Sequence, residues 1–177
     1  MRRLLWLGLI LLGCGEPQPA VDHPAEGNFA ERLTPTSLPA DEIGASGRIY
    51  VPVYSSIYWG SAAAQTDLTA TVSVRNVSDD HPIILESVIY FDSTGQKVRA
   101  YVDSPAALAP MATVDFVIAT HDDVGGAGAN FLVEWATRET EIEAPLIEAV
   151  MVGKYGSQGV SFTSMGRPVR RVRAPGR

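Results

Sequence analysis

The sequence predicts an all-β fold, a single antiparallel β-sandwich with an immunoglobulin-like arrangement of strands. Three observations predict it. From Arg48 onward, apolar and polar residues alternate with a period of two, as in half-buried strands. Seven or eight such runs follow one another, with proline and glycine between them rather than within them. No run has the spacing of an amphipathic helix. The Cys…Trp…Cys pattern of antibody domains is absent, so the expected likeness is one of architecture.

Each strand is predicted by its own alternation, taken in chain order. Residues 67–76 place Leu68, Ala70, Val72 and Val74 on one face and polar residues on the other. The later strands follow the same rule: residues 83–102 form two strands around a turn at Ser93, Thr94 and Gly95; residues 112–120 bury Val114, Phe116 and Ile118; residues 130–137 bury Phe131, Val133 and Trp135 and turn Glu134 outward; and residues 144–164 form a hairpin that turns near Tyr155, Gly156 and Ser157.

The start of the chain resembles a bacterial lipoprotein signal. Arg2 and Arg3 precede an apolar run that is too short to span a bilayer, which takes ~20 apolar residues. The run ends in Leu-Leu-Gly-Cys, which is similar to the lipobox, with an aliphatic residue at −3, a small residue at −1 and cysteine at +1. We therefore expect residues 1–13 to be a signal peptide and Cys14 to carry diacylglycerol, with a palmitate-type acyl chain on its amino group. The alternatives are a plain secretory signal or a buried structural cysteine.

The expected location and domain boundaries follow from this leader. A lipidated Cys14 anchors the chain in the cell envelope, and Gly15 rather than aspartate after it favours the outer membrane, facing the periplasm. Residues 14–47 are expected to form a flexible tether, since prolines recur there without a helical or strand period, apart from one apolar turn around residues 29–33. The β-sandwich is expected over residues 48–166 and a basic tail over residues 167–177.

Charge and cysteine content exclude several classes of function. The formal net charge of −6 argues against binding nucleic acid. The tail holds five arginines and no acid, whereas residues 14–166 hold 20 acidic and seven basic residues. The tail therefore contacts anionic lipid head groups, the acidic body or solvent. One cysteine forms neither an intramolecular disulfide nor a cysteine-based zinc or iron–sulfur site, and no cofactor is expected.

We do not expect an enzyme. The sequence contains no G-x-S-x-G elbow, no P-loop and no dinucleotide-binding fingerprint. Of three histidines, His23 lies in the expected tether, and nothing positions a Ser–His–Asp triad. A pair of acids for glycoside hydrolysis stays open, because only their separation in space would decide it.

Two stretches are candidate binding surfaces. In IYVPVYSSIYWG, the even spacing of Tyr50, Tyr54 and Tyr58 puts three rings on one face of a strand, where they stack on sugars or contact a protein partner. Alternatively, these rings cover the sheet or face the core. In GGAGAN, backbone amides can approach an anion, or the glycines only serve a loop that needs positive φ. The candidate residues of this second stretch are Gly125, Gly126, Gly128 and Asn130.

Two loops rich in aspartate and histidine suggest an alternative function, a small-ligand or metal-binding protein. Carboxylates and imidazoles bind zinc and manganese, and carboxylates bind calcium. In an immunoglobulin-like strand order, however, these loops lie at opposite ends of the sandwich, so we expect no metal site. The residues concerned are Asp79, Asp80 and His81 in one loop and His121, Asp122 and Asp123 in the other.

Five stretches occur together and in order: YVPVYSSIY, SVRN, YFDSTGQKVR, GGAGANFLVEW and EAVMVGKYGSQGVSFTSMGR. Together they resemble an uncharacterised bacterial family, the domain of unknown function 3124, found in exported proteins and lipoproteins. The resemblance covers about residues 47–167 and implies one exported domain, with no catalytic residues to transfer. The sequence therefore predicts a lipid-anchored envelope protein, a binding or accessory module that contacts the membrane through Cys14 and has an envelope protein or a glycan as its partner.

Overall fold

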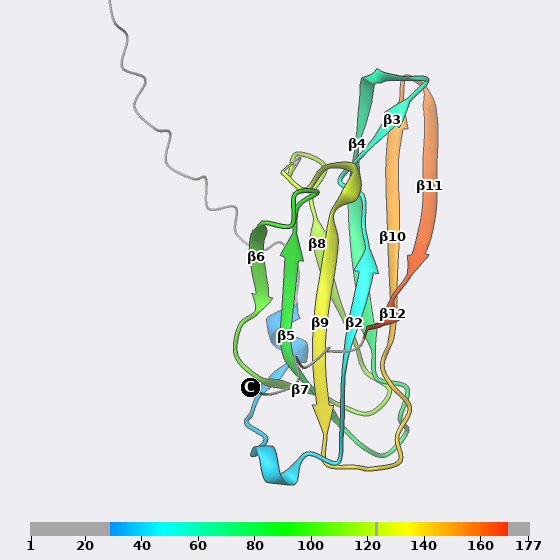
Figure 1. The fold of residues 1–177 in the computed structure, drawn as a ribbon. Coiled ribbons are helices and arrows are strands. Elements are labelled where there is room, and N and C mark those ends of the chain that lie inside the picture. Colours follow the sequence, from blue (N-terminus) through cyan, green and yellow to red (C-terminus); the bar gives the residue numbers. More distant parts are fainter. Residues whose placement is uncertain (1–28, 123, 170–177) are drawn as a thin grey trace, which may run out of the picture.

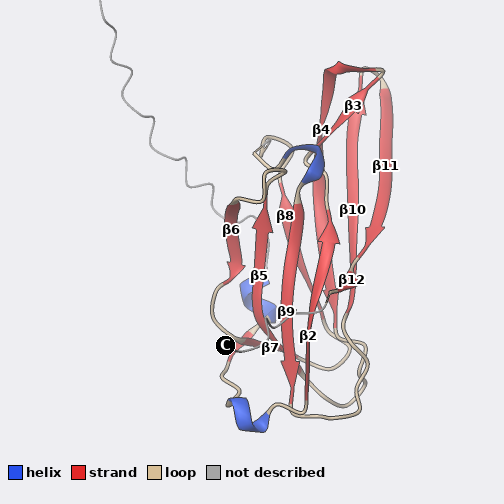
Figure 2. Ribbon diagram, viewed as in Figure 1, coloured by secondary structure: helices blue, strands red, loops and turns tan. Residues whose placement is uncertain are grey.

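The computed structural model describes residues 29–122 and 124–169, and it confirms the predicted all-β sandwich. Two antiparallel sheets pack face to face (Figures 1 and 2). The helical segments in this part of the chain are three single turns: α1 (Phe29–Arg32), η1 (Ala40–Glu42) and η2 (Gly126–Gly128). No helix within the described residues is long and apolar enough to cross a membrane.

The strands divide into a seven-stranded and a five-stranded sheet. The first has the order β1-β7-β5-β9-β2-β12, with β6 also paired to β5; the second has the order β11-β10-β4-β3, with β8 also paired to β4. The strand bounds are β1 (Thr34–Pro35), β2 (Ala45–Pro52), β3 (Ser56–Trp59), β4 (Ser61–Arg75), β5 (Ile83–Phe91), β6 (Lys97–Val102), β7 (Ala106–Leu108), β8 (Thr113–Ile118), β9 (Asn130–Thr137), β10 (Leu146–Tyr155), β11 (Gln158–Met165) and β12 (Arg167–Pro168).

The core lies between the sheets and consists of the inward residues that the alternation predicts. Every predicted inward residue of β4, β8 and β9 is buried. Aromatic rings fill the end of the core nearest the glycine-rich loop. Phe131 stacks on Tyr90 with ring centroids 5.2 Å apart and lies 5.3 Å from Tyr101, which meets Phe116 edge-on. Such ring pairs add to the stability that burial of their large apolar area provides.

The four central strands have the immunoglobulin arrangement, and the outer strands do not. β4 pairs with β8 and β5 pairs with β9, as the second and fifth and the third and sixth strands do in an immunoglobulin domain. The first long strand, β2, pairs with β9, while β10 crosses to pair with β4. The first and last strands have therefore exchanged sheets relative to the immunoglobulin order.

Part of the five-stranded sheet projects beyond the other sheet. β4 has 15 residues, so its second half pairs with β8 inside the sandwich while its first half pairs with β3. β10 and β11 run alongside this extension (Figure 1). The result is a two-hairpin projection, formed by β3, β4, β10 and β11, whose inner face has no second sheet opposite it among the described residues.

The folded part includes residues that the expected boundaries assigned to the tether and the tail. Arg32 donates a hydrogen bond to Thr113 O at 3.0 Å, and Leu33 packs against the core. β1 pairs with β7, and β2 begins at Ala45 rather than Arg48. In the expected tail, β12 pairs with β2. Two-residue strands and single side-chain contacts carry no periodicity, so the sequence pattern does not reveal them.

Candidate functional site

The three tyrosines do not share a strand face, contrary to the prediction from their even spacing. β2 ends at Pro52, and the chain crosses to the other sheet before β3 begins at Ser56. Tyr50 lies in the seven-stranded sheet beside β12, Tyr54 lies in the crossing, and Tyr58 lies on β3 in the projection. Tyr50 and Tyr58 are exposed, and Tyr54 is half-buried. The even spacing therefore does not produce one row of rings.

A different set of aromatic residues gathers on the inner face of the projection. The ring of Tyr54 meets Phe162 of β11 edge-on at 5.5 Å between centroids. Farther out, Trp59 of β3 stacks on Tyr155 of β10, with centroids 4.6 Å apart and planes 20° apart. We call Tyr54, Trp59, Tyr155 and Phe162 the aromatic platform.

The pleat and register of the strands explain why the platform faces inward. Residues alternate between the faces of a strand, so Tyr155 shares the face of the buried Met151, two pleats away. Tyr155 pairs with Gln158, and Phe162 lies on the same face of β11 two pleats further along. Tyr54 and Phe162 still pack against the core, whereas Tyr155 is 42% exposed because no strand of the other sheet covers it.

The glycine-rich loop lies at the base of the projection, where two serines hold it. Ser55 Oγ accepts a hydrogen bond from Gly126 N at 2.8 Å, and Ser93 Oγ accepts one from Gly128 N at 2.9 Å. Ser93 Oγ also donates to Gly125 O at 2.7 Å. Two of the amides that an anion would need are thus already bonded within the protein. These contacts favour the structural interpretation of the loop over anion binding.

Gly125 is required for space rather than for backbone conformation. Its φ of −70° and ψ of −39° are open to any residue, but a Cβ there would lie 1.7 Å from Tyr90 Oη. Tyr90 is fully buried, and its hydroxyl makes no hydrogen bond of good geometry, although the nearby Ser55 hydroxyl partly offsets the effect of burial on its pKa. Burial raises the pKa of Tyr90 well above its usual range, because the ionised form loses its hydration. The adjacent Gly126 does need glycine, since its φ is +72°.

Residues around this loop form further contacts beneath it. Asn130, the first residue of β9, is half-buried and opposes Pro52 and Phe91 in the neighbouring strands. Asp122 is buried, and its carboxylate lies 3.5 Å from the guanidinium of Arg99. Asp122 therefore has an ion-pair partner within the fold.

The turn that supplies Ser93 is organised by Asp92. Its Oδ1 accepts hydrogen bonds from the Thr94 hydroxyl at 2.8 Å, from Thr94 N at 2.8 Å and from Gln96 N at 2.9 Å. The Thr94 hydroxyl, followed by the backbone of Gln96, lowers the pKa of Asp92, because these donors favour the charged carboxylate.

The lowered pKa of Asp92 predicts an acid-dependent contribution to stability. The contribution is complete above the ordinary aspartate pKa of about 3.9 and is lost as pH falls through the lowered value. We therefore expect Asp92→Ala to be less stable than the wild type at pH 7, with a difference that shrinks below about pH 4. Urea unfolding at pH 7, 4 and 3 measures it. Thr94→Val keeps the carboxylate but removes one donor, and it should give part of the same change; a difference that grew on acidification would contradict the assignment.

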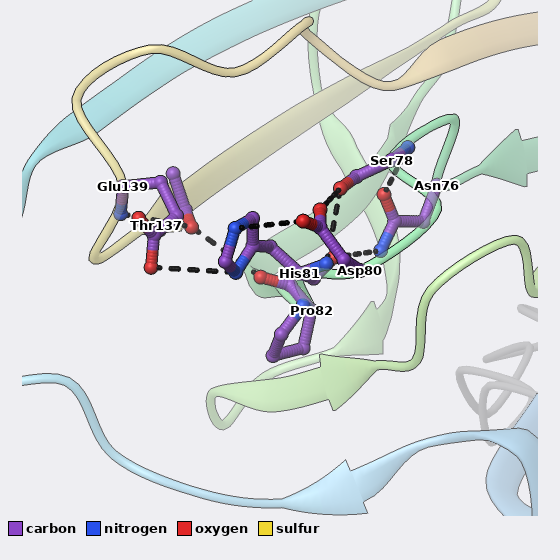
Figure 3. A network of polar contacts seen from close by, with 7 residues as sticks. All are labelled: Asn76, Ser78, Asp80, His81, Pro82, Thr137 and Glu139. Atoms are coloured by element: carbon purple, nitrogen blue, oxygen red, sulfur yellow. Dashed lines mark hydrogen bonds and ion pairs between the residues drawn. The ribbon is translucent and has the colours of Figure 1, made fainter.

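The first Asp/His loop is a hydrogen-bonded corner at the opposite end of the sandwich. Figure 3 shows His81 between two carboxylates, with Nε2 3.3 Å from Asp80 Oδ2 and Nδ1 3.5 Å from Glu139 Oε1. Asn76 is buried and donates to His81 O at 2.8 Å, while its Oδ1 accepts from Ser78 N at 3.0 Å. The Asn76 bonds hold the β4–β5 loop together, and the His81–Glu139 contact ties that loop to the segment that follows β9.

The two Asp/His loops do not converge. The first joins β4 to β5, and the second leaves β8 toward β9 at the other end of the sandwich (Figure 1). Asp123 lies outside the described residues. Among residues 29–122 and 124–169, no three His, Cys, Asp or Glu side chains are placed to hold a metal ion. The geometry therefore offers no support for a shared six-ligand site.

Two hollows mark the surface of the sheets. One, of about 580 Å³, lies beside β2 and β12 and contains Arg48, whose Nε donates to Glu134 Oε1 at 2.9 Å. The other, of about 620 Å³, lies on the outer face of the projection. Its lining combines carboxylate, ammonium, amide and hydroxyl groups from Gln65, Thr66, Asp67, Thr69, Thr120 and Lys154, with Val152 and Gly153. The outer face of the projection is thus mixed, since polar groups line this hollow while the exposed Tyr58, which opposes Gln65, and Val152 lie on the same face.

Sequence reasoning found Tyr54 and the glycine-rich loop but missed most of the platform. Trp59 stands in the quoted tyrosine stretch, and Tyr155 stands at the predicted hairpin turn, yet neither was singled out. A tryptophan and a tyrosine beside two different turns are a weak signal, because only the pairing of β3, β4 and β10 brings them together. Cys14 and residues 170–177 lie outside the described residues.

Comparison with known proteins gives a family and a distant structural likeness. No curated protein matches the chain in sequence. The solved structure described as "Crystal Structure of Thermotoga maritima 1070" is similar with a TM-score of 0.41 and 7% identity, over 68% of this chain and 92% of that one. A likeness at this level says nothing about the site. The pattern of the family described as "Protein of unknown function (DUF3124)" matches residues 46–169, from β2 to the end of the described part. The chain therefore belongs to the DUF3124 family.

Proposed function

We propose that this chain is a lipid-anchored protein of the cell envelope whose β-sandwich is a binding or accessory module, with the aromatic platform as its contact surface. The anchor is the lipid on Cys14, in the outer membrane facing the periplasm. The module carries out no catalysis in this proposal and uses no cofactor, and nucleic acid is not its partner.

The leader supports the anchoring part of the proposal. A charged start, a short apolar run and Leu-Leu-Gly-Cys form the order that a lipoprotein signal requires. Each buried CH₂ of an attached lipid contributes ~0.8 kcal/mol, so two or three chains hold a protein firmly where one does not. The acidic composition is consistent with a protein that works away from nucleic acid.

The stacked pair of Trp59 and Tyr155 carries the binding part of the proposal. Both rings lie beyond the seven-stranded sheet, so they contribute little to the core. Tryptophan and tyrosine dominate binding surfaces because they bury large areas with few rotatable bonds to fix. A flat pair of rings suits either an apolar protein segment or the face of a sugar ring.

A photo-crosslinking residue at Gln158 tests this surface in intact cells. Gln158 is exposed and opposes Tyr155 in the hairpin, on the inner face of the projection. We expect it to capture a discrete species, whose mass and composition distinguish a protein from a glycan. Trp59→Ala should reduce capture at least tenfold, since loss of a central aromatic contact costs about 2 kcal/mol or more.

Two controls make the experiment decisive. Trp59→Phe keeps an aromatic ring and should retain most of the capture. The same crosslinker at Met111, a 69% exposed residue between β7 and β8, should capture nothing comparable. Equal capture from both positions, or capture that is unchanged in Trp59→Ala, would contradict the platform as the contact surface.

A further inference from the structure

β11 is the edge strand of the five-stranded sheet, and its outer side has no partner in the described part of the chain (Figure 1). Tyr155 and Gln158 close a two-residue turn, and Gly166 N donates to Ile147 O at 2.8 Å. Hydrogen bonding alternates along an antiparallel ladder, so the even-numbered residues of β11 bond to β10. The backbone N–H and C=O groups that point away from the sheet belong to Gly159, Ser161, Thr163 and Met165.

Within the described residues, this edge lacks the features that keep exposed strands from pairing with another chain. Proteins protect such edges with charges, proline, bulges or a covering segment. The eight residues of β11, QGVSFTSM, contain no charge and no proline, and their register with β10 is continuous. The chain as a whole carries a net charge of −6, so this uncharged edge is where two copies approach without repulsion.

β11 is also complementary to itself. In a pair of copies related by a two-fold axis, the free backbone N–H and C=O groups of the odd-numbered β11 residues would bond between the copies. Each odd-numbered residue of one copy therefore opposes an odd-numbered residue of the other. One such register pairs Ser161 with Thr163 of the second copy and Met165 with Gly159. Met165 is 48% exposed, and the space that a Cβ at Gly159 would fill has no atom within 4 Å. An exposed side chain thus meets an open position, and two hydroxyl-bearing residues meet each other.

We propose that two copies of this chain associate through β11, which joins their five-stranded sheets into one continuous antiparallel sheet. The outward side chains of β11 and the neighbouring Val150 and Val152, all exposed in one copy, then lie on a shared outer face. The inference is independent of the aromatic platform, which occupies the inner face of the projection.

Thr163→Pro and Thr163→Val test the association as a matched pair. In one copy the N–H of Thr163 points to solvent, so proline there removes no internal bond, as at other edge strands. Between two copies, it removes a donor at the centre of the pair. We expect the wild type and Thr163→Val, purified at full length, to show a concentration-dependent dimer by sedimentation. Thr163→Pro should raise the dimer dissociation constant at least tenfold while keeping the wild-type circular dichroism spectrum.

Two further variants keep the test falsifiable if the proline variant does not fold. Thr163→Glu places a charge on the edge of each copy and should weaken the dimer similarly. Ser161→Cys combined with Thr163→Cys should give a disulfide-linked dimer on oxidation, because directly opposed residues have Cα atoms about 5.5 Å apart. A single-copy mass for the wild type at every concentration, or an unweakened dimer in both Thr163→Pro and Thr163→Glu, would overturn the proposal.

Discussion

Gly125→Ala is expected to lower the free energy of unfolding by about 3 kcal/mol, although it adds only one methyl group, at a buried position of the loop. The added Cβ would lie 1.7 Å from Tyr90 Oη and 2.9 Å from Ala129 Cβ. Tyr90 has no room to withdraw, because its ring is fully buried and stacked on Phe131. The loop has to move instead, and that movement breaks its hydrogen bonds to Ser93. Urea unfolding at pH 7 measures the change.

Tyr90→Phe provides the matched control for this prediction. The hydroxyl it removes is buried and makes no hydrogen bond of good geometry, with only the Ser55 hydroxyl near it, so the single change should leave stability within about 1 kcal/mol of the wild type or raise it. In the double variant, the absence of Oη should restore about 1 kcal/mol or more of the stability lost in Gly125→Ala. The rescue is partial because the Cζ atom still lies 2.7 Å from the new methyl position. Strict additivity of the two changes would show that the hydroxyl does not restrict residue 125.

Cys14→Ser is expected to abolish lipid attachment and release the protein from membranes. Thioether formation needs the nucleophilic sulfur, and a serine hydroxyl is not activated in the same way. Without acyl chains, the nine-residue apolar run at residues 4–12 is too short to span a bilayer, which takes ~20 apolar residues. Labelled fatty acid incorporation and membrane fractionation measure the two parts of the result.

Retention of the Cys14→Ser protein in membranes, together with unchanged labelling, would reject the lipoprotein proposal. Retention without labelling would instead show that another part of the chain holds the membrane. Replacing Gly13 with a bulky residue, as in Gly13→Leu, offers an independent control, because a small residue before the cysteine is one of the features by which the leader resembles a lipoprotein signal. Its labelled precursor should accumulate uncleaved.

The inward faces of the strands could be predicted because burial in a sandwich repeats every two residues. β8 illustrates this, since Val114, Phe116 and Ile118 are all fully buried. The separation of the Asp/His loops was also predictable, because β4, β5, β8 and β9 keep the immunoglobulin pairing even though β2 and β10 do not.

The broken tyrosine row could not be predicted from the same alternation. Val51 and Val53 are both fully buried, so the inward pattern continues unchanged through the point where the chain passes from one sheet to the other. Alternation records which side of the chain is buried and carries no information about which sheet the chain belongs to.

The aromatic platform depends on still longer-range information. Trp59 meets Tyr155 only because the β3–β4 turn and the register of β4 with β10 place both at the same height of the projection. Likewise, the need for glycine at position 125 comes from Tyr90 on another strand. Neither requirement leaves a local mark in the sequence.

The pairing of β2 between β9 and β12 has a mechanical consequence. β2 runs from the end that holds His81 toward the projection, so tension between its N-terminal side and the projection acts along the strand. The eight residue pairs between β2 and β9 then resist the sliding of one strand past the other all at once, rather than opening one at a time. β1 pairs with β7 through two residues, and Glu42, just before β2, forms an ion pair with Arg138, just after β9; we expect these weaker contacts to yield first. We therefore expect the domain to extend slightly under a small pull and to resist a larger one through the β2–β9 pairing.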